Sequence, residues 1–360
     1  MSNPSQFKPA GSATLIGSLP VKDYDQALEL ILNHTPEIPL WPQLPGSPTE
    51  GMLQQFTVGF PGFCEEEGRA FFRTSDPDFA DQQLAFFEAY LAAAEDLAGL
   101  ENSPFVSSED RVPGLYRFRQ RLQENPPAGL RAVKGQITGP FTLLTGLKDE
   151  QQRDAWFDPT INEIVIKGLA LRAAWQVRFL AAAEKPVLLF LDEPALAGLG
   201  SSAYISVSLE AIGQSLDEVL TSIREAGGLA GIHVCANTDW DFLLDRQLDV
   251  LSFDAYGFFD RLAGNKKGLY RFLERGGILA WGLVPTGEPK AIMAETAEAL
   301  AQRWEQQAEQ IVNEDWDRAK ILQQTLITPS CGTGSLTIEE AMRVLELTRD
   351  LSAILRQRYL

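Results

Sequence analysis

The sequence predicts an α/β protein: a (β/α)8 TIM barrel with a hairpin-plus-helix insertion between its second and third strands. Two observations predict this class. Short, apolar, β-prone runs recur along the 360 residues, and most are followed by a stretch with helical periodicity. The runs are continuously apolar, which is typical of parallel strands covered on both faces. Eight such runs favour a closed barrel, and an open doubly wound sheet is the alternative.

The eight runs are short and end in Gly, Pro or a polar residue. We expect strands at residues 13–18, 38–43, 132–138, 186–192, 229–235, 250–255, 278–284 and 324–331. The second run is the weakest, because Pro39 and Pro42 cannot donate hydrogen bonds to a ladder. The fourth, PVLLFLD, is the clearest.

Helices fit between most of these runs. We expect them at residues 23–32, 158–183, 216–226, 290–313 and 337–358, the last opened by a capping box from Thr337 to Glu340. The interval 44–131 is far longer than a βα unit. Within it, 56–73 is typical of two short strands joined by an acidic turn, and 79–100 of a helix. We therefore expect one domain over 1–360, with 44–131 inserted over one end of the barrel.

The charge balance limits the classes of partner. The chain carries 31 basic and 49 acidic residues, a net charge of −18, which repels phosphate backbones and anionic membrane surfaces. It has no apolar run long enough to span a membrane, and its N-terminal stretch lacks a basic start followed by an apolar segment. Three cysteines do not form a disulfide framework. These features predict a cytoplasmic protein that binds neither nucleic acid nor membranes.

Rare residue types gather at the predicted carboxyl ends of the strands, where barrels of this class place catalysis. His233 and Cys235 end the fifth strand, and Cys331 ends the eighth. Residues i and i+2 of a strand point to the same side, so all three can converge at the barrel mouth. One imidazole and two thiolates are a typical zinc set, and Asp254 after the sixth strand is the best fourth ligand. Each residue alone is more often packed core, but their joint occurrence favours zinc.

Two carboxylates follow the most apolar strand. Asp192 and Glu193 could bind an amino group or serve as acid and base. The alternative is structural, because Asp192 before Pro194 also suits the start of a helix. We favour a functional role for at least one of them.

Several of these motifs, in this order, resemble the C-terminal catalytic barrel of cobalamin-independent methionine synthase, and more closely the short stand-alone core members of that group. The uroporphyrinogen decarboxylase-like barrels share the fold. The resemblance covers most of the chain and is carried by Ile16-Gly17-Ser18-Leu19-Pro20, Val133-Lys134-Gly135, Thr138-Gly139-Pro140, Asp192-Glu193-Pro194-Ala195-Leu196, His233-x-Cys235, Asp254 and Pro329-Ser330-Cys331-Gly332.

The resemblance implies a methyltransferase that uses zinc to activate a thiol, with homocysteine as acceptor and methionine as product. It implies that the zinc ligands are His233, Cys235, Cys331 and Asp254. It also implies that the homocysteine carboxylate is bound by Ile16, Gly17 and Ser18. The amino group would be bound by Asp192, with Glu193 beside it in the same catalytic motif.

Three departures bear on this reading. Asp254 stands where the family usually has a longer glutamate. The loop after the seventh run, beginning at Leu283, lacks the histidine that the full-length enzymes are thought to use with their folate donor. The sequence also has no counterpart of their N-terminal barrel. A methylated corrinoid, carried by a partner protein, is therefore the expected donor, with a folate as the alternative. Two further alternatives are a corrinoid-dependent enzyme with another thiol acceptor, and a non-catalytic barrel that binds a methylated or tetrapyrrole-like ligand.

Overall fold

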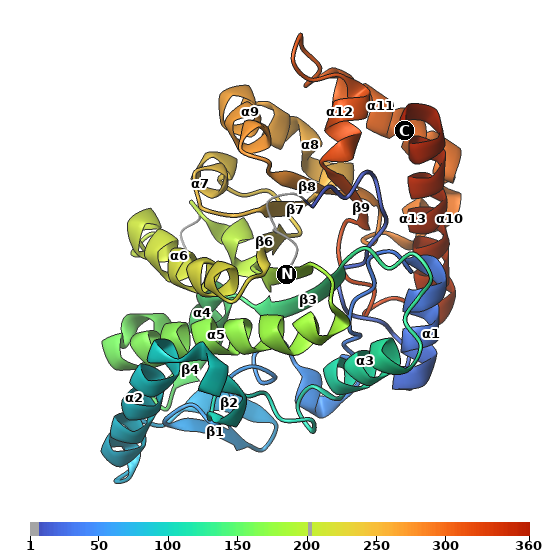
Figure 1. Cartoon of the computed structure of the whole chain (residues 1–360). Helices are drawn as coiled ribbons and strands as arrows, with labels where there is room; N and C mark the ends of the chain where they lie inside the picture. Colours follow the sequence, from blue (N-terminus) through green and yellow to red (C-terminus); the bar gives the residue numbers. More distant parts are fainter. Residues whose placement is uncertain (1–6, 201–203) are drawn as a thin grey trace.

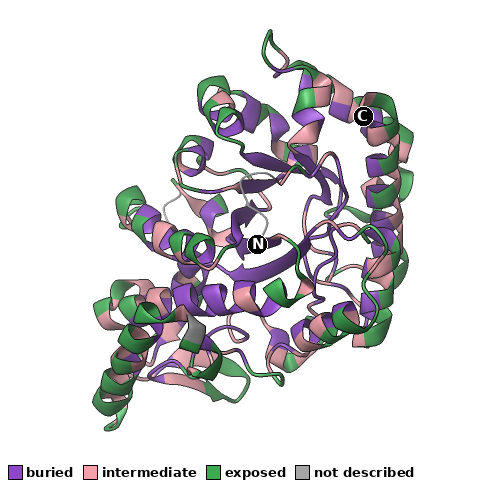
Figure 2. Ribbon diagram, viewed as in Figure 1, coloured by how far each residue is buried: buried purple, intermediate pink, exposed green. Residues whose placement is uncertain are grey.

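The computed structural model describes residues 7–200 and 204–360, so the first six residues of the N-terminal stretch lie outside it. Its centre is a curled parallel sheet with helices around the outside (Figure 1). Within the described residues this sheet has six strands, in the spatial order β3 (Val133–Thr138), β5 (Val187–Asp192), β6 (Leu229–Val234), β7 (Val250–Asp254), β8 (Ile278–Val284) and β9 (Thr325–Pro329). Figure 2 shows that these strands are almost wholly buried, as expected of parallel strands covered on both faces.

The prediction of the first two strands was wrong, because residues 13–18 and 38–43 form no regular strand. They are extended segments between the two edges of the sheet, held by three isolated parallel bridges: Ala13 with Ile327 of β9, Ser18 with Gln43, and Leu40 with Lys134 of β3. In the second segment, Pro39 and Pro42 have no N–H group, so a ladder cannot extend along it. The described part of the chain therefore forms a curled six-stranded half-barrel, which is consistent with a TIM-like barrel, and the eight-stranded barrel is not confirmed.

The helices surround the sheet. Their bounds are α1 Tyr24–His34, α2 Phe79–Glu95, α3 Pro113–Glu124, α4 Pro140–Gly146, α5 Pro159–Leu180, α6 Leu209–Glu225, α7 Trp240–Leu244, α8 Ala255–Ala263, α9 Lys266–Glu274, α10 Pro289–Ala294, α11 Ala297–Glu309, α12 Arg318–Gln323 and α13 Ile338–Tyr359. Short 3₁₀ turns are η2 Pro48–Glu50, η3 Leu97–Asn102, η4 Ala155–Phe157, η5 Ala181–Ala183 and η6 Pro194–Gly198. None of the described helices has both the length and the apolar character needed to cross a membrane.

Local sequence signals account for the helix ends. The capping box at Thr337 and Glu340 is present at the start of α13, as predicted. The helix expected over 290–313 is instead two helices. Thr296 takes an extended conformation and its hydroxyl accepts a hydrogen bond from Ala299 N, so a new helix begins there.

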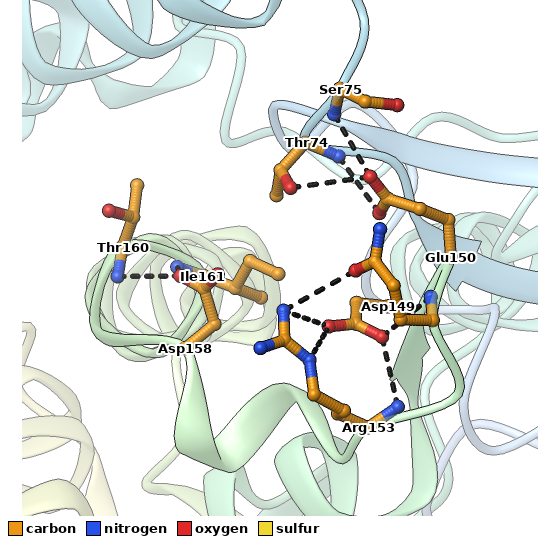
Figure 3. Close-up of polar contacts among 9 residues, drawn as sticks. Thr74, Ser75, Asp149, Glu150, Arg153, Asp158, Thr160 and Ile161 are labelled. Carbon is orange, nitrogen blue, oxygen red and sulfur yellow. Dashed lines mark hydrogen bonds and ion pairs between the residues drawn. The ribbon is translucent and has the colours of Figure 1, made fainter.

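The expected hairpin is confirmed within narrower bounds. β1 (Phe63–Glu66) and β2 (Arg69–Phe72) pair antiparallel, and β2 also pairs in parallel with β4 (Lys148–Asp149), which follows α4. Figure 3 shows the polar contacts behind this pairing. Glu150 accepts hydrogen bonds from Thr74 N at 3.1 Å and Ser75 N at 3.0 Å. The side chain of Asp149 accepts from Arg153 N and Arg153 Nε. The insertion is thereby fastened to the chain after α4.

The interior of the curled sheet is divided into two levels. Near the amino ends of the strands it is apolar, and Leu188, Phe190 and Leu326 belong to one buried cluster there. Toward the carboxyl ends the inward positions become polar, as at Asp192 and His233. The polar inward positions therefore lie at the carboxyl ends of the strands, where the candidate site was predicted.

Candidate metal centre and active site

A cavity of about 340 Å³ opens at the carboxyl ends of the strands. Thr138, Asp192, His233 and Cys235 line it from the ends of β3, β5 and β6, and Cys331 lines it from just beyond β9. The insertion contributes to the wall as well, through residues 50–52. Segments far apart in the sequence therefore line one open cavity.

Three of the predicted metal ligands come together in this cavity. One ligand atom from each of His233, Cys235 and Cys331 lies within 4.8 Å of the other two. His233 is buried and its Nδ1 lies 2.9 Å from Ser252 Oγ on the neighbouring strand. Its Nε2 is buried and has no hydrogen-bond partner among the described residues. If Nδ1 carries the proton and donates it to Ser252, the lone pair of Nε2 is free to bind a metal.

The surroundings of His233, Cys235 and Cys331 favour protonation states that suit metal binding. Burial, and then the charge of Lys134, lower the pKa of His233 to about 3, so the imidazole is neutral at pH 7. A hydrogen bond from Cys331 lowers the pKa of Cys235 to about 7. The same hydrogen bond, with burial, raises the pKa of Cys331. One thiolate next to a thiol donor therefore forms readily at neutral pH.

These residues fit a zinc ion. Zinc prefers nitrogen and sulfur ligands, and a catalytic zinc commonly has three protein ligands with one position open. The buried, unpartnered Nε2 of His233 is costly to the fold unless a ligand or water satisfies it. The open cavity beside the group leaves room for a further ligand from a substrate.

The structure does not bring Asp254 into this group. Asp254 is the N-cap of α8, and its Oδ1 accepts a hydrogen bond from Gly257 N at 2.8 Å. This is a helix-capping role, and a carboxylate one methylene shorter than glutamate also has less reach.

Asp192 lies in the cavity with an unused acceptor. Its Oδ1 is buried and has no hydrogen-bond partner among the described residues. Burial raises the pKa of Asp192 to about 7, and the nearby charge of Lys134 opposes the rise. The Lys134 ammonium is itself committed, because Nζ donates to Ile16 O at 2.6 Å. A cationic or N–H donor on a ligand would satisfy Asp192.

Glu193 differs from the expectation, because it does not line the cavity. Its carboxylate accepts from Phe141 N at 2.9 Å, from Thr142 N at 2.8 Å and from Thr142 Oγ1 at 2.6 Å. The two N–H groups are free donors of the first turn of α4, and the third donor is a hydroxyl of the same turn. Gly139 permits this contact, since a Cβ there would collide with the Glu193 side chain. Glu193 thus holds α4 in place.

The 16–18 segment is only partly in the cavity. Ile16 and Ser18 line the cavity, whereas Gly17 is not among its lining residues, and a Cβ at Gly17 would approach the Gln43 and Gln136 side chains to 2.8–3.0 Å. Ser18 O accepts from Thr333 N at 3.0 Å, which joins the segment to the loop after β9.

Three residues that contribute to the candidate site were not predicted from the sequence. Lys134 and Ser252 occupy inward positions, two residues before Gln136 and Asp254, so strand alternation could have found them. Glu50 comes from the insertion, where it is buried, lines the cavity and accepts from Tyr24 OH at 2.6 Å. No strand pattern points to Glu50, because its position depends on how the insertion folds back.

Comparison with known proteins gives structural likeness only. No protein-family model matches the chain, and no curated protein matches it. A methyltransferase from Methanosarcina mazei superposes with a TM-score of 0.54 at 12% identity, over 98% of this chain and 97% of that chain. A B12-independent methionine synthase from Shewanella sp. W3-18-1, in complex with selenomethionine, gives 0.47 at 14% identity over 68% and 67%. A putative B12-independent methionine synthase from Listeria monocytogenes gives 0.46 at 17% identity over 67% and 69%. At these identities the first likeness establishes a shared fold along nearly the whole chain.

Proposed function

We propose that this protein is a zinc-dependent methyltransferase that methylates a thiol, with homocysteine as acceptor and methionine as product. The observation that carries the proposal is the convergence of His233, Cys235 and Cys331 within 4.8 Å in a cavity. The proposal is supported by the structural neighbour of the same fold, itself described as a methyltransferase. It also agrees with the resemblance to cobalamin-independent methionine synthase.

The residues of the cavity suit an amino-acid thiol. Asp192 offers a buried, unpartnered oxygen to the amino group. Ile16 and Ser18 of the 16–18 segment also line the cavity, and the carboxylate would bind at this segment. Lys134 holds this segment through Ile16 O, which fixes the distance between the two binding points.

His233, Cys235 and Cys331 would hold the zinc. When bound, the metal would lower the pKa of the substrate thiol so that a thiolate exists at neutral pH. The thiol gives its proton to solvent water, its sulfur bonds to the methyl carbon, and the bond from that carbon to the donor breaks with its electron pair left on the donor. The walls of the cavity would position the acceptor for this reaction.

We further propose that the methyl donor is a corrinoid carried by a partner protein. The cavity of about 340 Å³ has room for an amino acid and opens to solvent, so a bulky donor would approach it from outside the mouth. The loop after β8 places Thr286 within 2.9 Å of Ser330 and offers no histidine to protonate a folate leaving group. A corrinoid donor needs no such proton.

The test combines metal analysis with an activity assay. The purified protein should hold about one zinc per chain, and C235S and C331S should lose most of it. Cys64 is the matched control, because it lies in β1, outside the group, so C64S should retain the metal. Methionine formed from homocysteine is then measured by mass spectrometry with methylcobalamin and with methyltetrahydrofolate separately.

The outcomes separate the parts of the proposal. Absence of bound zinc, or equal zinc in C235S and C64S, would overturn the metal site. Zinc without methionine from either donor would overturn the methyl-transfer step. Methionine formed from methyltetrahydrofolate with no corrinoid present would overturn the donor alone.

A further inference from the structure

Helix α2 of the insertion presents a second apolar stripe on its surface. The stripe consists of Ala80, Leu84, Phe87, Leu91 and Ala94, with spacings of four, three, four and three residues. Leu84 and Leu91 are each 61% exposed, which is high for leucine, and Phe87 is half-buried. This spacing is the a/d pattern with which one helix packs against another.

Most of the stripe lies off the face by which α2 packs onto its own protein, and the half-buried Phe87 is the member that also packs against the core. That face is offset by one residue and includes Phe86 and Ala93, the two buried residues of the helix. One residue is about 100° of rotation on an α-helix, so the exposed stripe is a separate seam beside the packed one. The other large exposed apolar side chains, such as Phe157 and Ile338, are scattered over other elements. Figure 2 shows α2 at the periphery with much of its outer side exposed.

The stripe continues into a groove between α2 and α6. The groove has a volume of about 350 Å³, and its floor is formed by Ala170 and Leu171 of α5. Tyr90 and Ala94 form its α2 wall, so Ala94 belongs to both the stripe and the groove. An apolar seam beside an apolar floor is the form of a helix-binding groove.

Acidic side chains flank this surface on both sides. Asp81, Glu88 and Glu95 follow the far edge of the stripe at seven-residue intervals, and α2 contains no lysine or arginine. Across the groove, α6 contributes acidic residues to the wall: Asp217, Glu218 and Glu225. Arg246 pairs with Asp217 at 2.9 Å and Lys167 with Glu218 at 3.4 Å. Charge therefore remains on Glu225 and on the three acids of α2, which have no ion-pair partner among the described residues.

We propose that this surface binds an amphipathic helix of a partner protein, with an apolar stripe bordered by lysine or arginine. The length of α2, 17 residues, accommodates a partner helix of about 25 Å. A second copy is disfavoured, because pairing stripe to stripe would bring the acids of α2 against their own copies. An anionic membrane is disfavoured for the same electrostatic reason.

A designed peptide tests the surface directly. The probe is a fluorescent helix of about 17 residues with leucines at a and d and lysines at the flanking positions, and its control peptide has glutamates in place of the lysines. Fluorescence anisotropy with the full chain should show binding of the lysine peptide only. Raising the salt concentration should weaken that binding.

Paired variants separate the apolar and the electrostatic contributions. The double variant Leu84→Asn/Leu91→Asn should raise the Kd for the lysine peptide at least about tenfold. The reason is that the variant lacks the two leucine side chains that the bound peptide would bury. Glu88→Lys/Glu95→Lys should weaken the lysine peptide and improve the glutamate peptide. Ile338→Asn is the matched control, because Ile338 is 54% exposed on another helix. This variant should bind the lysine peptide as tightly as the wild type does.

Three results would overturn the proposal. One is equal binding of the lysine peptide to the double leucine variant and to the wild type. Another is equal binding of the two peptides by the wild type. The third is a wild-type dimer in solution that becomes monomeric in the leucine variant, since the stripe would then be a contact between copies. Circular dichroism of each variant shows that the fold is retained.

Discussion

At the residue scale, the adjacent carboxylates Asp192 and Glu193 lie in different surroundings and have different hydrogen-bond partners. Asp192 ends β5 on the inward side, with one buried oxygen left unpartnered toward the cavity. Glu193, one residue on, turns to the other side of the strand end and receives three hydrogen bonds from the start of α4. The alternation of a strand is enough to separate a binding group from a structural group.

The substitution Glu193→Gln should destabilise the protein without removing its metal. Glutamine replaces one acceptor oxygen with an NH₂ group that faces the N–H of Phe141 or Thr142. The buried mismatch should lower the free energy of unfolding by about 1–3 kcal/mol, measured by urea denaturation. Zinc content should be unchanged. A variant with wild-type stability and no activity would show instead that Glu193 takes part in catalysis.

The substitution Asp192→Asn should weaken acceptor binding and spare the metal. An amide retains the shape of the carboxylate but loses the charge-assisted hydrogen bond to an amino group. We expect the KM for homocysteine to rise about tenfold or more, with zinc retained. A KM equal to that of the wild type would contradict the assignment of Asp192 to the amino group.

The site could be predicted in part, and the reasons are local. His233 and Cys235 share one strand, so alternation alone predicts that they point the same way, and Cys331 follows from its strand end. Asp254 shares these properties but is engaged as a helix cap, which depends on the helix that begins after it. Glu50 could not be predicted, because its place in the cavity is set by the insertion and by its contact with Tyr24.

At the element scale, the link between the hairpin and β4 should be sensitive to acid. Burial tends to raise the pKa of Glu150, but hydrogen bonds from backbone N–H groups of Glu150, Thr74 and Ser75 dominate and lower it from 4.5 to about 2. A lowered pKa in the folded state means that the stabilisation is present above pH 4.5 and is lost as the pH falls from there toward 2.

The substitution Glu150→Gln tests this dependence. At pH 7 the variant should show faster amide hydrogen exchange in β1 and β2 than the wild type, and the difference should shrink as the pH falls from 4.5 toward 2. Glu67→Gln, in the exposed hairpin turn, is the control and should exchange like the wild type. A difference between Glu150→Gln and wild type that does not change with pH would contradict the role of the charge.

Elements that pack on both faces were the most predictable. The expected strands at 186–192, 229–235 and 278–284 agree with β5, β6 and β8 to within one residue at each end, because continuous apolar runs leave little choice of register. Short helices such as α4 and α9 were not predicted, since few turns give a weak periodic signal. The prediction of one continuous helix over 290–313 was wrong. The apolar period continues across Thr296, but the side chain of Thr296 caps a new helix there.

At the scale of the whole molecule, Glu37 joins three distant parts of the chain. Its carboxylate accepts from Ser12 Oγ at 2.7 Å and from Arg356 near the end of α13 at 2.7 Å, and it pairs with Arg131 before β3 at 3.4 Å. Arg131 also donates to Pro9 O at 2.8 Å. These contacts lie at the opposite end of the sheet from the cavity, where they hold the extended 13–18 segment and α13 against the strands.

The substitution Glu37→Gln should therefore lower global stability and leave metal binding intact. Burial raises the pKa of Glu37, but the hydrogen bonds from Arg356 and Ser12 and the charges of Arg356 and Arg131 lower it overall. Its stabilisation is thus complete above its unfolded pKa of about 4.5 and is lost as the pH falls through the lower, folded value. Because the side chain is 29% exposed, we expect a loss of only about 1–2 kcal/mol at pH 7, measured by urea denaturation and smaller at acid pH. Equal stability of variant and wild type at pH 7 would show that the two ends of the chain are held by apolar packing alone.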